Sequence, residues 1–236
     1  MITVVIPTLN AEGGLAATLS ALVPAVVEGL VREVIVVDGG SADRTLKIAD
    51  QAGVDVLASK PGRGVQLAAG AARARFPWLL FLHADTVLEP GWEREAAAFI
   101  ERVDAGKREP AAAAFGFALD DTGVAPRLLE RLVELRNLLF RLPYGDQGLL
   151  IPKALYGAVG GYRPLALMED VDIVRRLSRR QRILLRPKAV TSALRYRRDG
   201  YTRRVARNQL CLLMYFMRMP SESIARMHGT EASREA

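Results

Sequence analysis

The chain is poor in cysteine and has no long apolar run. Its single cysteine, Cys211, excludes a disulfide framework and a cysteine-based metal site. No stretch approaches the ~18 apolar residues of a spanning helix. The apolar run at 2–7 is short and lacks a basic segment before it, so it does not resemble a signal peptide. We therefore expect a cytoplasmic protein whose contact with the inner face of a cell membrane is at most peripheral.

Positive charge is in excess and is concentrated in two segments. The formal net charge is +7, and arginines or lysines crowd residues 175–188 and again residues 195–207. Such density suits phosphates, nucleic acid or anionic lipid headgroups, and it is also found on a solvated helix face. Composition alone leaves these alternatives open.

Apolar strands alternate with amphipathic helices in the first half of the chain. We predict strands at 2–7, 33–38, 54–58 and 78–82, and helices at 14–28, 44–52, 65–74 and 92–103. Nearly continuous apolar strands between helices indicate an α/β fold, with a mainly parallel, Rossmann-like sheet covered on both faces. The second half is less regular, with a strand at 111–119, a helix at 126–142, a strand at 149–151 and a helix at 203–217.

The length of 236 residues fits a single domain. Within it we predict a regular first half at 1–106, a looser second half at 107–200, and a C-terminal helix and tail at 201–236.

Polar residues follow the predicted strands in four segments: VVIPTLNAE (4–12), VVDGGSADRT (36–45), FLHADT (81–86) and MEDVD (168–172). In parallel sheets, ligands bind beyond the carboxyl ends of the strands. Acidic side chains beside glycine-rich turns suit a nucleotide and a metal ion. The dinucleotide-binding fingerprint and the P-loop are both absent. FLHADT resembles an aspartyl phosphatase segment, but His83 stands where the nucleophile would be, which disfavours that mechanism.

Together with GRGVQLAAGA (62–71), YGDQGLLI (144–151) and the continuation IVRRL (173–177), these segments resemble family 2 glycosyltransferases. They are most similar to a small bacterial branch with GRGxQL and HADT motifs. The resemblance covers about residues 1–215 and implies the GT-A fold. The implied activity is inverting transfer of a sugar from a nucleotide-sugar to an acceptor hydroxyl, usually with Mn²⁺ or Mg²⁺.

The resemblance implies a nucleotide site at the first turns of the sheet. Asp38 matches the acidic residue that binds the base, commonly uracil, although helix capping at the turn is the alternative. The first-strand turn would wall the base and ribose, and a plain turn is the alternative for Asn10. Arg63 and Gln66 would reach the diphosphate, unless Arg63 is simply solvated. The predicted nucleotide-binding residues are Pro7, Thr8, Asn10, Asp38, Gly39, Arg63, Gln66 and Ala84.

The HADT segment stands where the family carries its DxD metal motif. Alternation along an extended segment would place His83 and Asp85 on one side. Asp85 is then expected to bind a divalent cation that bridges the two phosphates. An imidazole in the set suits Mn²⁺ better than Mg²⁺, and His83 could instead hold the ribose or a water.

The acidic segment MEDVD matches the family's catalytic carboxylates. Asp170 takes the position of the general base that removes the acceptor proton, with Glu169 beside it. We expect Glu169, Asp170 and Asp172 to raise one another's pKa. The alternative is an acidic first turn of a helix, stabilised by the helix dipole, and it is the favoured interpretation for Asp172.

A loop after Tyr144 carries Asp146 and Gln147, which we predict bind donor-sugar hydroxyls. The QxxRW motif that many relatives carry after the base is missing. Arginines at 203–207 are candidates to replace its phosphate contacts, but no residue can be carried over from the family.

The C-terminal segment bears on the acceptor. Six arginines at 195–207 precede an apolar stretch at 210–217. Such a helix either lies in a membrane interface or docks on the domain as ordinary core. A membrane contact would favour a lipid-like acceptor such as a polyprenyl phosphate, a glycolipid or a carotenoid acid.

Two other classes of protein rank below glycosyl transfer. A nucleotidyltransferase usually has a basic glycine-rich loop near its first strand, whereas VVIPTLNAE is acidic. A non-catalytic nucleic-acid-binding protein would use the arginine tracts but leave the ordered acidic motifs unexplained. We therefore expect no nucleic acid partner.

Overall fold

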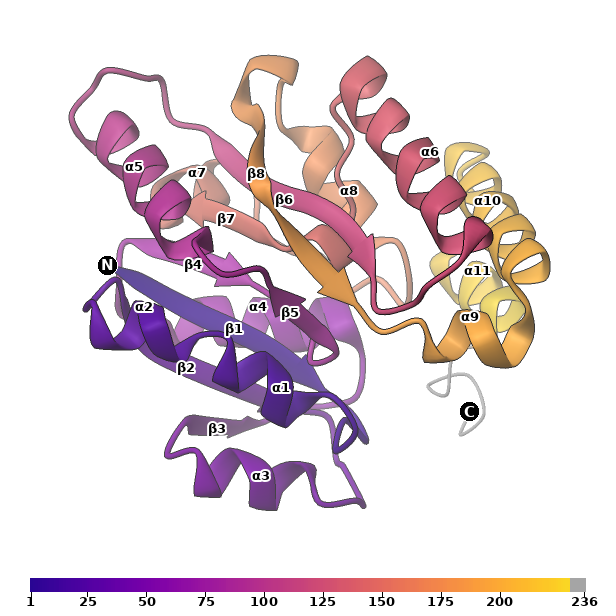
Figure 1. Cartoon of the computed structure of the whole chain (residues 1–236), viewed down its shortest axis with the longest axis horizontal. Coiled ribbons are helices and arrows are strands. Elements are labelled where there is room, and N and C mark those ends of the chain that lie inside the picture. Colours follow the sequence, from indigo (N-terminus) through magenta and orange to yellow (C-terminus); the bar gives the residue numbers. More distant parts are fainter. Residues whose placement is uncertain (230–236) are drawn as a thin grey trace.

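A single twisted sheet runs through the molecule (Figure 1). In the computed structural model, which describes residues 1–229, eight strands pair in the order β3-β2-β1-β4-β7-β6-β8-β5. The strands are β1 (Ile2–Thr8), β2 (Val31–Asp38), β3 (Asp55–Ala58), β4 (Trp78–Phe81), β5 (Thr86–Leu88), β6 (Ala112–Leu119), β7 (Leu149–Pro152) and β8 (Arg182–Thr191).

Both faces of the sheet are covered by helices, which is why β1 is buried along its whole length. Val4 and Ile6 face a core with the helices on one side of the sheet, whereas Val5 faces a second core with the helices on the other side. Successive strand residues point to opposite faces, so most positions are apolar, and the buried hydroxyls of Thr3 and Thr8 are hydrogen-bonded to Glu33 and Asp38. The predicted α/β class with two covered faces is confirmed.

The helices of the first half are α1 (Leu15–Ser20), α2 (Val23–Val27), α3 (Thr45–Gln51), α4 (Arg63–Arg73) and α5 (Trp92–Asp104). The single helix predicted at 14–28 is two helices. Pro24 lies in the first turn of α2, where a backbone N–H would have no partner within the helix. Because proline has no N–H, it cannot donate to the turn before it, and α1 does not continue into α2.

Strand direction changes in the second half of the chain. Strands β3, β2, β1 and β4 are parallel, whereas β7 is antiparallel to β4 and β6. Strand β8 is parallel to β6 and antiparallel to β5. The sequence did not predict β8, because its Arg182, Arg186 and Lys188 resembled a solvated helix face. These cations instead stand at alternate positions of a strand.

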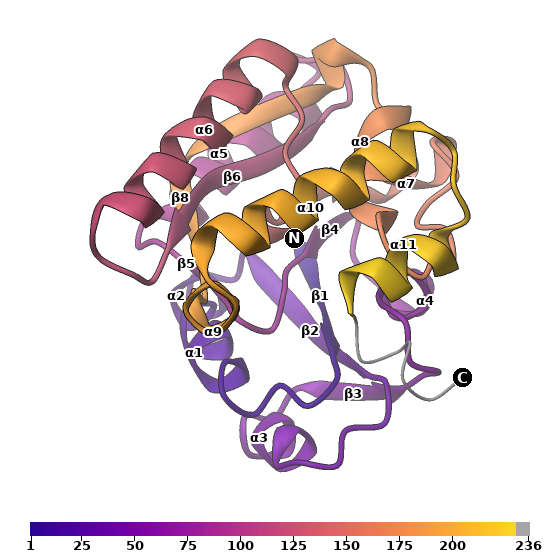
Figure 2. The ribbon, with the colours of Figure 1, turned by 90° about the vertical axis from the view of Figure 1, so that its right-hand side faces the viewer.

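Six helices and two short 3-10 turns complete the described chain: α6 (Val124–Phe140), η1 (Gly145–Gln147), α7 (Lys153–Ala158), α8 (Glu169–Arg176), η2 (Arg179–Gln181), α9 (Leu194–Asp199), α10 (Tyr201–Phe216) and α11 (Ser221–His228). Helices α9, α10 and α11 lie on the right-hand side of Figure 1, the side that faces the viewer in Figure 2.

Helix α10 docks on the domain through one face only. Cys211 and Met214 pack against Leu167 and against Ile224 of α11. Within residues 1–229, no helix is both long and apolar enough to cross a bilayer. The end of the predicted C-terminal segment, from residue 230, lies outside the described residues.

Candidate active site

The carboxylate of Asp38 organises the turn after β2. Its Oδ2 accepts hydrogen bonds from the N–H groups of Gly40 (2.9 Å) and Ser41 (2.8 Å), and its Oδ1 accepts from the hydroxyls of Ser41 (2.6 Å) and Thr8 (3.0 Å). Burial raises the pKa of Asp38, but these four donors outweigh it and leave the pKa below its usual value. Asp38 therefore holds the turn, and a contact with a base stays a prediction.

The loops after β1 and β2 are bonded to each other. The Oδ1 of Asn10 accepts from the N–H of Ala42 (2.9 Å), and the N–H of Asn10 donates to the hydroxyl of Ser41 (2.9 Å). Asn10 adopts a left-handed conformation with φ 51°, as a turn residue does. Pro7 and Thr8 are buried at the end of β1. The two loops thus form one continuous wall at the carboxyl edge of the sheet.

Gln66 lies under this wall and does not point out of it. Its buried amide nitrogen donates to the backbone carbonyls of Thr8 (2.7 Å) and Val37 (2.8 Å). Gly39 lies directly above, since a Cβ there would come within 3.2 Å of the Gln66 amide nitrogen. The expected diphosphate contact of Gln66 does not fit this geometry, because both amide hydrogens hold the ends of β1 and β2 together.

Arg63 and Glu169 form an ion pair across the site. The Nε of Arg63 donates to Oε1 of Glu169, whose side chain is fully buried, while a third of the arginine side chain remains exposed. Burial raises the pKa of Glu169, Arg63 lowers it and Asp170 raises it, with a net rise. The second oxygen of Glu169 is buried without a partner among the described residues. The terminal nitrogens of Arg63 have no protein acceptor in that part of the chain and are free to meet an anion.

The HADT segment ends β4 in a turn. The N–H of Thr86 donates to the carbonyl of His83 (3.2 Å), so the expected extended alternation of residues 83 and 85 is wrong. The Thr18 hydroxyl of α1 donates to the carbonyl of Ala84 (2.9 Å), and this bond fixes the turn on α1. Ala84 is buried. Within residues 1–229, the Asp85 carboxylate has neither a hydrogen-bond donor nor a cation as partner.

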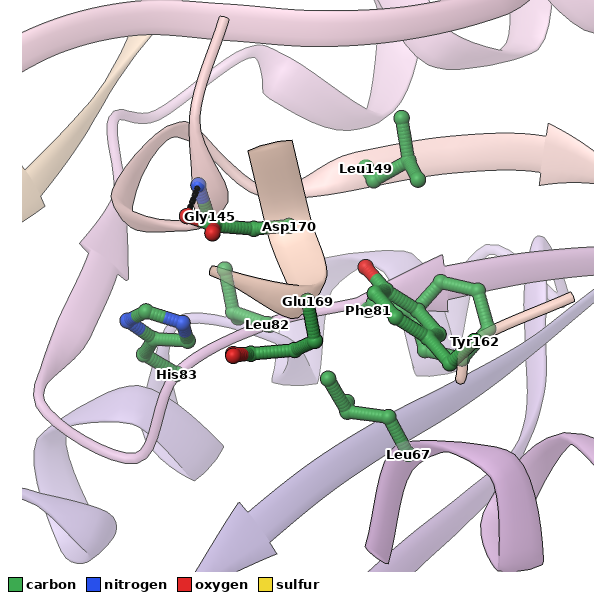
Figure 3. Close-up of a pocket in the computed structure, with 9 residues that line it drawn as sticks. All are labelled: Leu67, Phe81, Leu82, His83, Gly145, Leu149, Tyr162, Glu169 and Asp170. Carbon is green, nitrogen blue, oxygen red and sulfur yellow. Dashed lines mark hydrogen bonds between the residues drawn. The ribbon is translucent and has the colours of Figure 1, made fainter. Parts of the chain in front are cut away.

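Asp170 and His83 meet around Gly145. The N–H of Gly145 donates to Oδ2 of Asp170 (2.7 Å), and the N–H of Val171 donates to Oδ1 (2.8 Å). A Cβ on Gly145 would come within 2.9 Å of Asp170 Oδ2 and 3.0 Å of His83 Nε2. Figure 3 shows the bond to Asp170, with His83 and the Glu169 carboxylate turned toward the same small hollow. The structure thus joins the predicted base and the HADT histidine.

His83 is an uncharged imidazole. Burial lowers its pKa well below the usual value, and the nearby cations Arg63 and Arg195 lower it further. A neutral ring can accept a proton or bind a metal. The effect of Arg195 also places this arginine near the site, although the sequence singled it out only as one member of a tract.

Asp146 and Gln147, predicted together as sugar ligands, have different environments. Gln147 is fully buried; its amide donates to the Phe115 carbonyl (2.8 Å) and its oxygen accepts from Arg136 (3.2 Å). The proposed sugar contact of Gln147 therefore does not fit the structure. Burial raises the pKa of Asp146 to about 6, despite the nearby Arg136. Its carboxylate has no hydrogen-bond donor from another residue within the described chain and remains a candidate.

Asp172 is a structural residue. It pairs with Arg176 (2.7 Å) and Arg163 (3.3 Å), and Tyr215 of α10 donates to it (3.4 Å). These contacts connect α8 with the C-terminal helix. The alternative favoured for Asp172, a role outside catalysis, agrees with this geometry.

Most arginines of the second basic tract are already paired. Asp199 accepts from Arg198, Arg204 and Arg207. Their hydrogen bonds hold the pKa of Asp199 well below its usual value. The tract is therefore partly a structural network at the start of α10, and the charge left for a ligand is smaller than the sequence indicates.

His228 was missed by the sequence analysis. Its Nε2 lies 3.3 Å from a guanidinium nitrogen of Arg204, and its Nδ1 is buried without a partner among the described residues. Burial lowers its pKa to about 4, and nearby cations that include Arg204 and Arg63 add to this. The only sequence signal was that His228 is one of two histidines.

The residues present can bind a divalent cation only if a bound ligand supplies further donor atoms. No three His, Cys, Asp or Glu side chains among the described residues converge on one point. Asp85 is a carboxylate without an internal partner, and His83 is a neutral imidazole. Two protein donors completed by phosphate oxygens and water is a usual arrangement for such cations.

Comparison with known proteins gives a consistent result. Residues 3–107 match the model of the family described as Glycosyl transferase family 2. A PGL/p-HBAD biosynthesis glycosyltransferase of Mycobacterium bovis is 30% identical over 191 residues, which covers 69% of this chain and 63% of the relative. A protein of the same name in Mycobacterium tuberculosis matches equally. The chain thus spans less than two thirds of the length of these relatives.

Solved structures share the fold. TarS 1-349 of S. aureus, solved with UDP-GlcNAc, has a TM-score of 0.61 at 20% identity, covering 81% of this chain and 58% of that one. Glucosyl-3-phosphoglycerate synthase of Mycobacterium tuberculosis, solved with Mn²⁺, uridine diphosphate and glucosyl-3-phosphoglycerate, has a TM-score of 0.59 at 21% identity, covering 93% and 81%. This match assigns residues 3–107 to glycosyl transferase family 2, and the architecture is the GT-A fold of these solved glycosyltransferases.

Proposed function

We propose that the protein transfers a sugar from a nucleoside diphosphate sugar to an acceptor hydroxyl, with inversion at the sugar carbon. The observation that carries this proposal is the placement of Asp170. Its carboxylate is fixed by two backbone N–H groups beside His83 and the Arg63–Glu169 pair, at the sheet edge that also carries the Asp38 turn. A fixed carboxylate next to a free arginine suits a reaction in which a hydroxyl attacks and a diphosphate leaves.

The donor lies along the edge formed by the loops after β1 and β2. The base and ribose contact the wall around Asp38 and Asn10, and the diphosphate meets the guanidinium groups of Arg63 and of the exposed Arg195. We favour uridine because the solved relatives TarS and glucosyl-3-phosphoglycerate synthase were crystallised with uridine nucleotides. Asp146 faces the donor sugar.

A divalent cation, Mn²⁺ or Mg²⁺, would be held by Asp85 with His83. When bound, such an ion neutralises the charge that develops on the leaving diphosphate. The synthase structure that contains Mn²⁺ supports the choice of manganese, as does the imidazole donor.

Asp170 acts as the general base. Its carboxylate takes the proton of the acceptor hydroxyl while the hydroxyl oxygen forms a bond to the anomeric carbon. The bond from that carbon to the diphosphate oxygen breaks on the opposite face, and its electron pair leaves with the nucleotide. Glu169 does not take part directly: it positions Arg63 through their ion pair.

The acceptor is lipid-like. Support comes from the name of the M. bovis relative, a PGL/p-HBAD biosynthesis glycosyltransferase, and from the exposed apolar face of α10. We propose that the enzyme works at the cytoplasmic face of a membrane without spanning it. Residues 1–106 would bind the donor, residues 107–200 would supply the base, and the C-terminal helices would contact the acceptor.

Turnover of Asp170→Asn tests the role of the base. We expect release of UDP from a panel of UDP-sugars to fall at least ~100-fold, because a general base contributes about that much. UDP affinity should change less than about threefold, since Asp170 touches no part of the nucleotide. Asp50→Asn, the same change at an exposed position of α3, is the matched control. Full turnover in Asp170→Asn would contradict this mechanism.

A further inference from the structure

Helix α6 carries an apolar stripe that nothing within the described chain covers. Its inner face is accounted for: Leu129 and Val133 pack against Phe117 and Leu119 of β6. On the outer face, six apolar side chains are between 50% and 83% exposed. At 100° per residue they fall within an arc of about 120° along nearly the whole helix. They are Val124, Leu128, Leu132, Leu135, Leu138 and Leu139.

Helix α10 presents a second apolar face on the same side of the molecule. Leu210, Leu213, Phe216 and Met217 are all more than 40% exposed, while Cys211 on the inner face is fully buried. Both helices lie on the right-hand side of Figure 1 and face the viewer in Figure 2. Isolated exposed leucines are normal, but two helices on one side of the molecule that each expose a row of apolar side chains are of the kind that marks an interaction surface.

Cations surround this patch and acids are scarce on it. Helix α10 contains no Asp or Glu. On α6, Glu130 is buried, where it accepts from Arg127 and from the N–H of Leu119, and Glu134 is exposed beside the stripe. Arg131 is exposed in the middle of the α6 stripe and has no carboxylate partner within residues 1–229. The partner of this surface is therefore apolar in part and negatively charged.

A basic hollow lies at the end of the stripe. It encloses about 430 Å³ between the end of α6 and the start of β8. Leu138 and Leu184, both exposed, give it apolar lining. Arg108, Arg141 and Arg182 line it as well, and they outnumber the one carboxylate in its lining, Glu134. Apolar lining with arginines around it suits the junction between an acyl chain and a phosphate headgroup.

We propose that the face formed by α6 and α10 docks on the surface of an anionic phospholipid bilayer, with the hollow beside α6 receiving a lipid phosphate. Leucines and Phe216 enter the interface while the arginines remain at headgroup level, as in interfacial amphipathic helices. A second copy of the chain is a poorer partner for this face. It would bring the same arginines to a two-fold contact, in a protein whose net charge is already +7.

Flotation with lipid vesicles tests the proposal. The full chain should bind vesicles that contain about a third phosphatidylglycerol and should bind pure phosphatidylcholine at least tenfold more weakly. Leu132→Asp with Leu135→Asp should reduce binding to the anionic vesicles at least tenfold. Val23→Asp with Val27→Asp makes the same change of charge at exposed positions of α2, away from this face, and should bind like the natural chain.

A second pair of variants separates charge from fold. Arg108→Gln and Arg131→Gln should each weaken binding to the anionic vesicles by about fivefold and leave the weak binding to neutral vesicles unchanged. These polar exchanges keep the test valid even if the aspartates were to disturb α6, whose integrity thermal unfolding monitors.

Three results would overturn the proposal. One is no binding of the natural chain to anionic vesicles. Another is equal loss in the α6 and α2 variants. The third is a dimer in light scattering that the α6 aspartates dissociate while vesicle binding stays unchanged, which would assign the face to a second copy. All measurements omit the sugar donor, so they leave the proposed transfer reaction untouched.

Discussion

The Cα of Gly145 lies between Asp170 and His83, with no room for a side chain. The N–H of the same residue fixes the Asp170 carboxylate at 2.7 Å. One glycine thus sets the distance between the predicted base and the histidine of the HADT turn. Neither neighbour is close in sequence, so only the fold brings the three together.

Gly145→Ala should damage catalysis more than stability. The added Cβ would force Asp170 or His83 to move by a few tenths of an ångström, and turnover should fall ~10- to 100-fold. Gly157→Ala is the control, because a Cβ there meets nothing within 4 Å. It lies in α7, and the exchange should stabilise the protein by about 0.5 kcal/mol or leave it unchanged. Equal turnover in the two variants, measured as UDP release, would show that the spacing at Gly145 is unimportant.

Arg63→Met should destabilise the fold, because it leaves the fully buried Glu169 carboxylate without its cation. Breaking a buried pair from one side costs about 3 kcal/mol. Adding Glu169→Gln should restore part of this loss by removing the unpaired charge. Urea unfolding at neutral pH measures both. Unchanged stability in Arg63→Met would mean that the pair is not formed in solution.

The stability of the protein should depend on Asp146 in a defined pH range. Its pKa is raised to about 6 in the folded protein, so the folded state binds this proton more tightly than the unfolded chain does. The contribution of protonated Asp146 to the free energy of unfolding is therefore present below about pH 4 and is lost as the pH rises through 6. Asp146→Asn should therefore match the natural protein at pH 4 and exceed it by about 2 kcal/mol at pH 8. If urea unfolding gave the same stability difference between Asp146→Asn and the natural protein at both pH values, the raised pKa of Asp146 would be refuted.

At the scale of elements, the side chain of Gln66 ties α4 to the ends of β1 and β2. Gln66→Leu keeps the volume but removes donors from two buried carbonyls, and the free energy of unfolding should fall by about 2 kcal/mol. Gln51→Leu, at an exposed position of α3, should have little effect. If Gln66 bound the diphosphate directly, nucleotide affinity would fall in Gln66→Leu while stability stayed the same.

The elements of the first half were predicted well because their pattern of apolar residues can be recognised from short stretches of sequence. Strands buried on both faces read as continuous apolar runs, and β1, β2, β3 and β4 begin and end within about two residues of the expected positions. The helix at 14–28 was predicted whole because the break before Pro24 has no apolar signature. Strand β8 was missed because alternating arginines stand on its exposed side.

At the scale of the whole molecule, motif positions predicted which segments meet but not what each side chain does. Gln66 and Gln147 were assigned to ligands, yet their amides bond backbone carbonyls of Val37 and Phe115. Such long-range partners leave no mark in the spacing of a motif. His228 meets Arg204 only because α11 folds back along α10, a packing that the sequence pattern does not encode.

Thermal unfolding with nucleotides tests the central claim most directly. UDP with Mn²⁺, at about a hundredfold its Kd, should stabilise the protein by about 2.7 kcal/mol, and EDTA should remove the effect. Asp85→Ala should abolish this stabilisation and Asp50→Ala should retain it, because Asp85 belongs to the proposed metal site and Asp50 does not. No stabilisation by UDP, GDP, dTDP or CDP, or the same stabilisation in Asp85→Ala, would contradict a metal-assisted nucleotide-sugar site at this edge of the sheet.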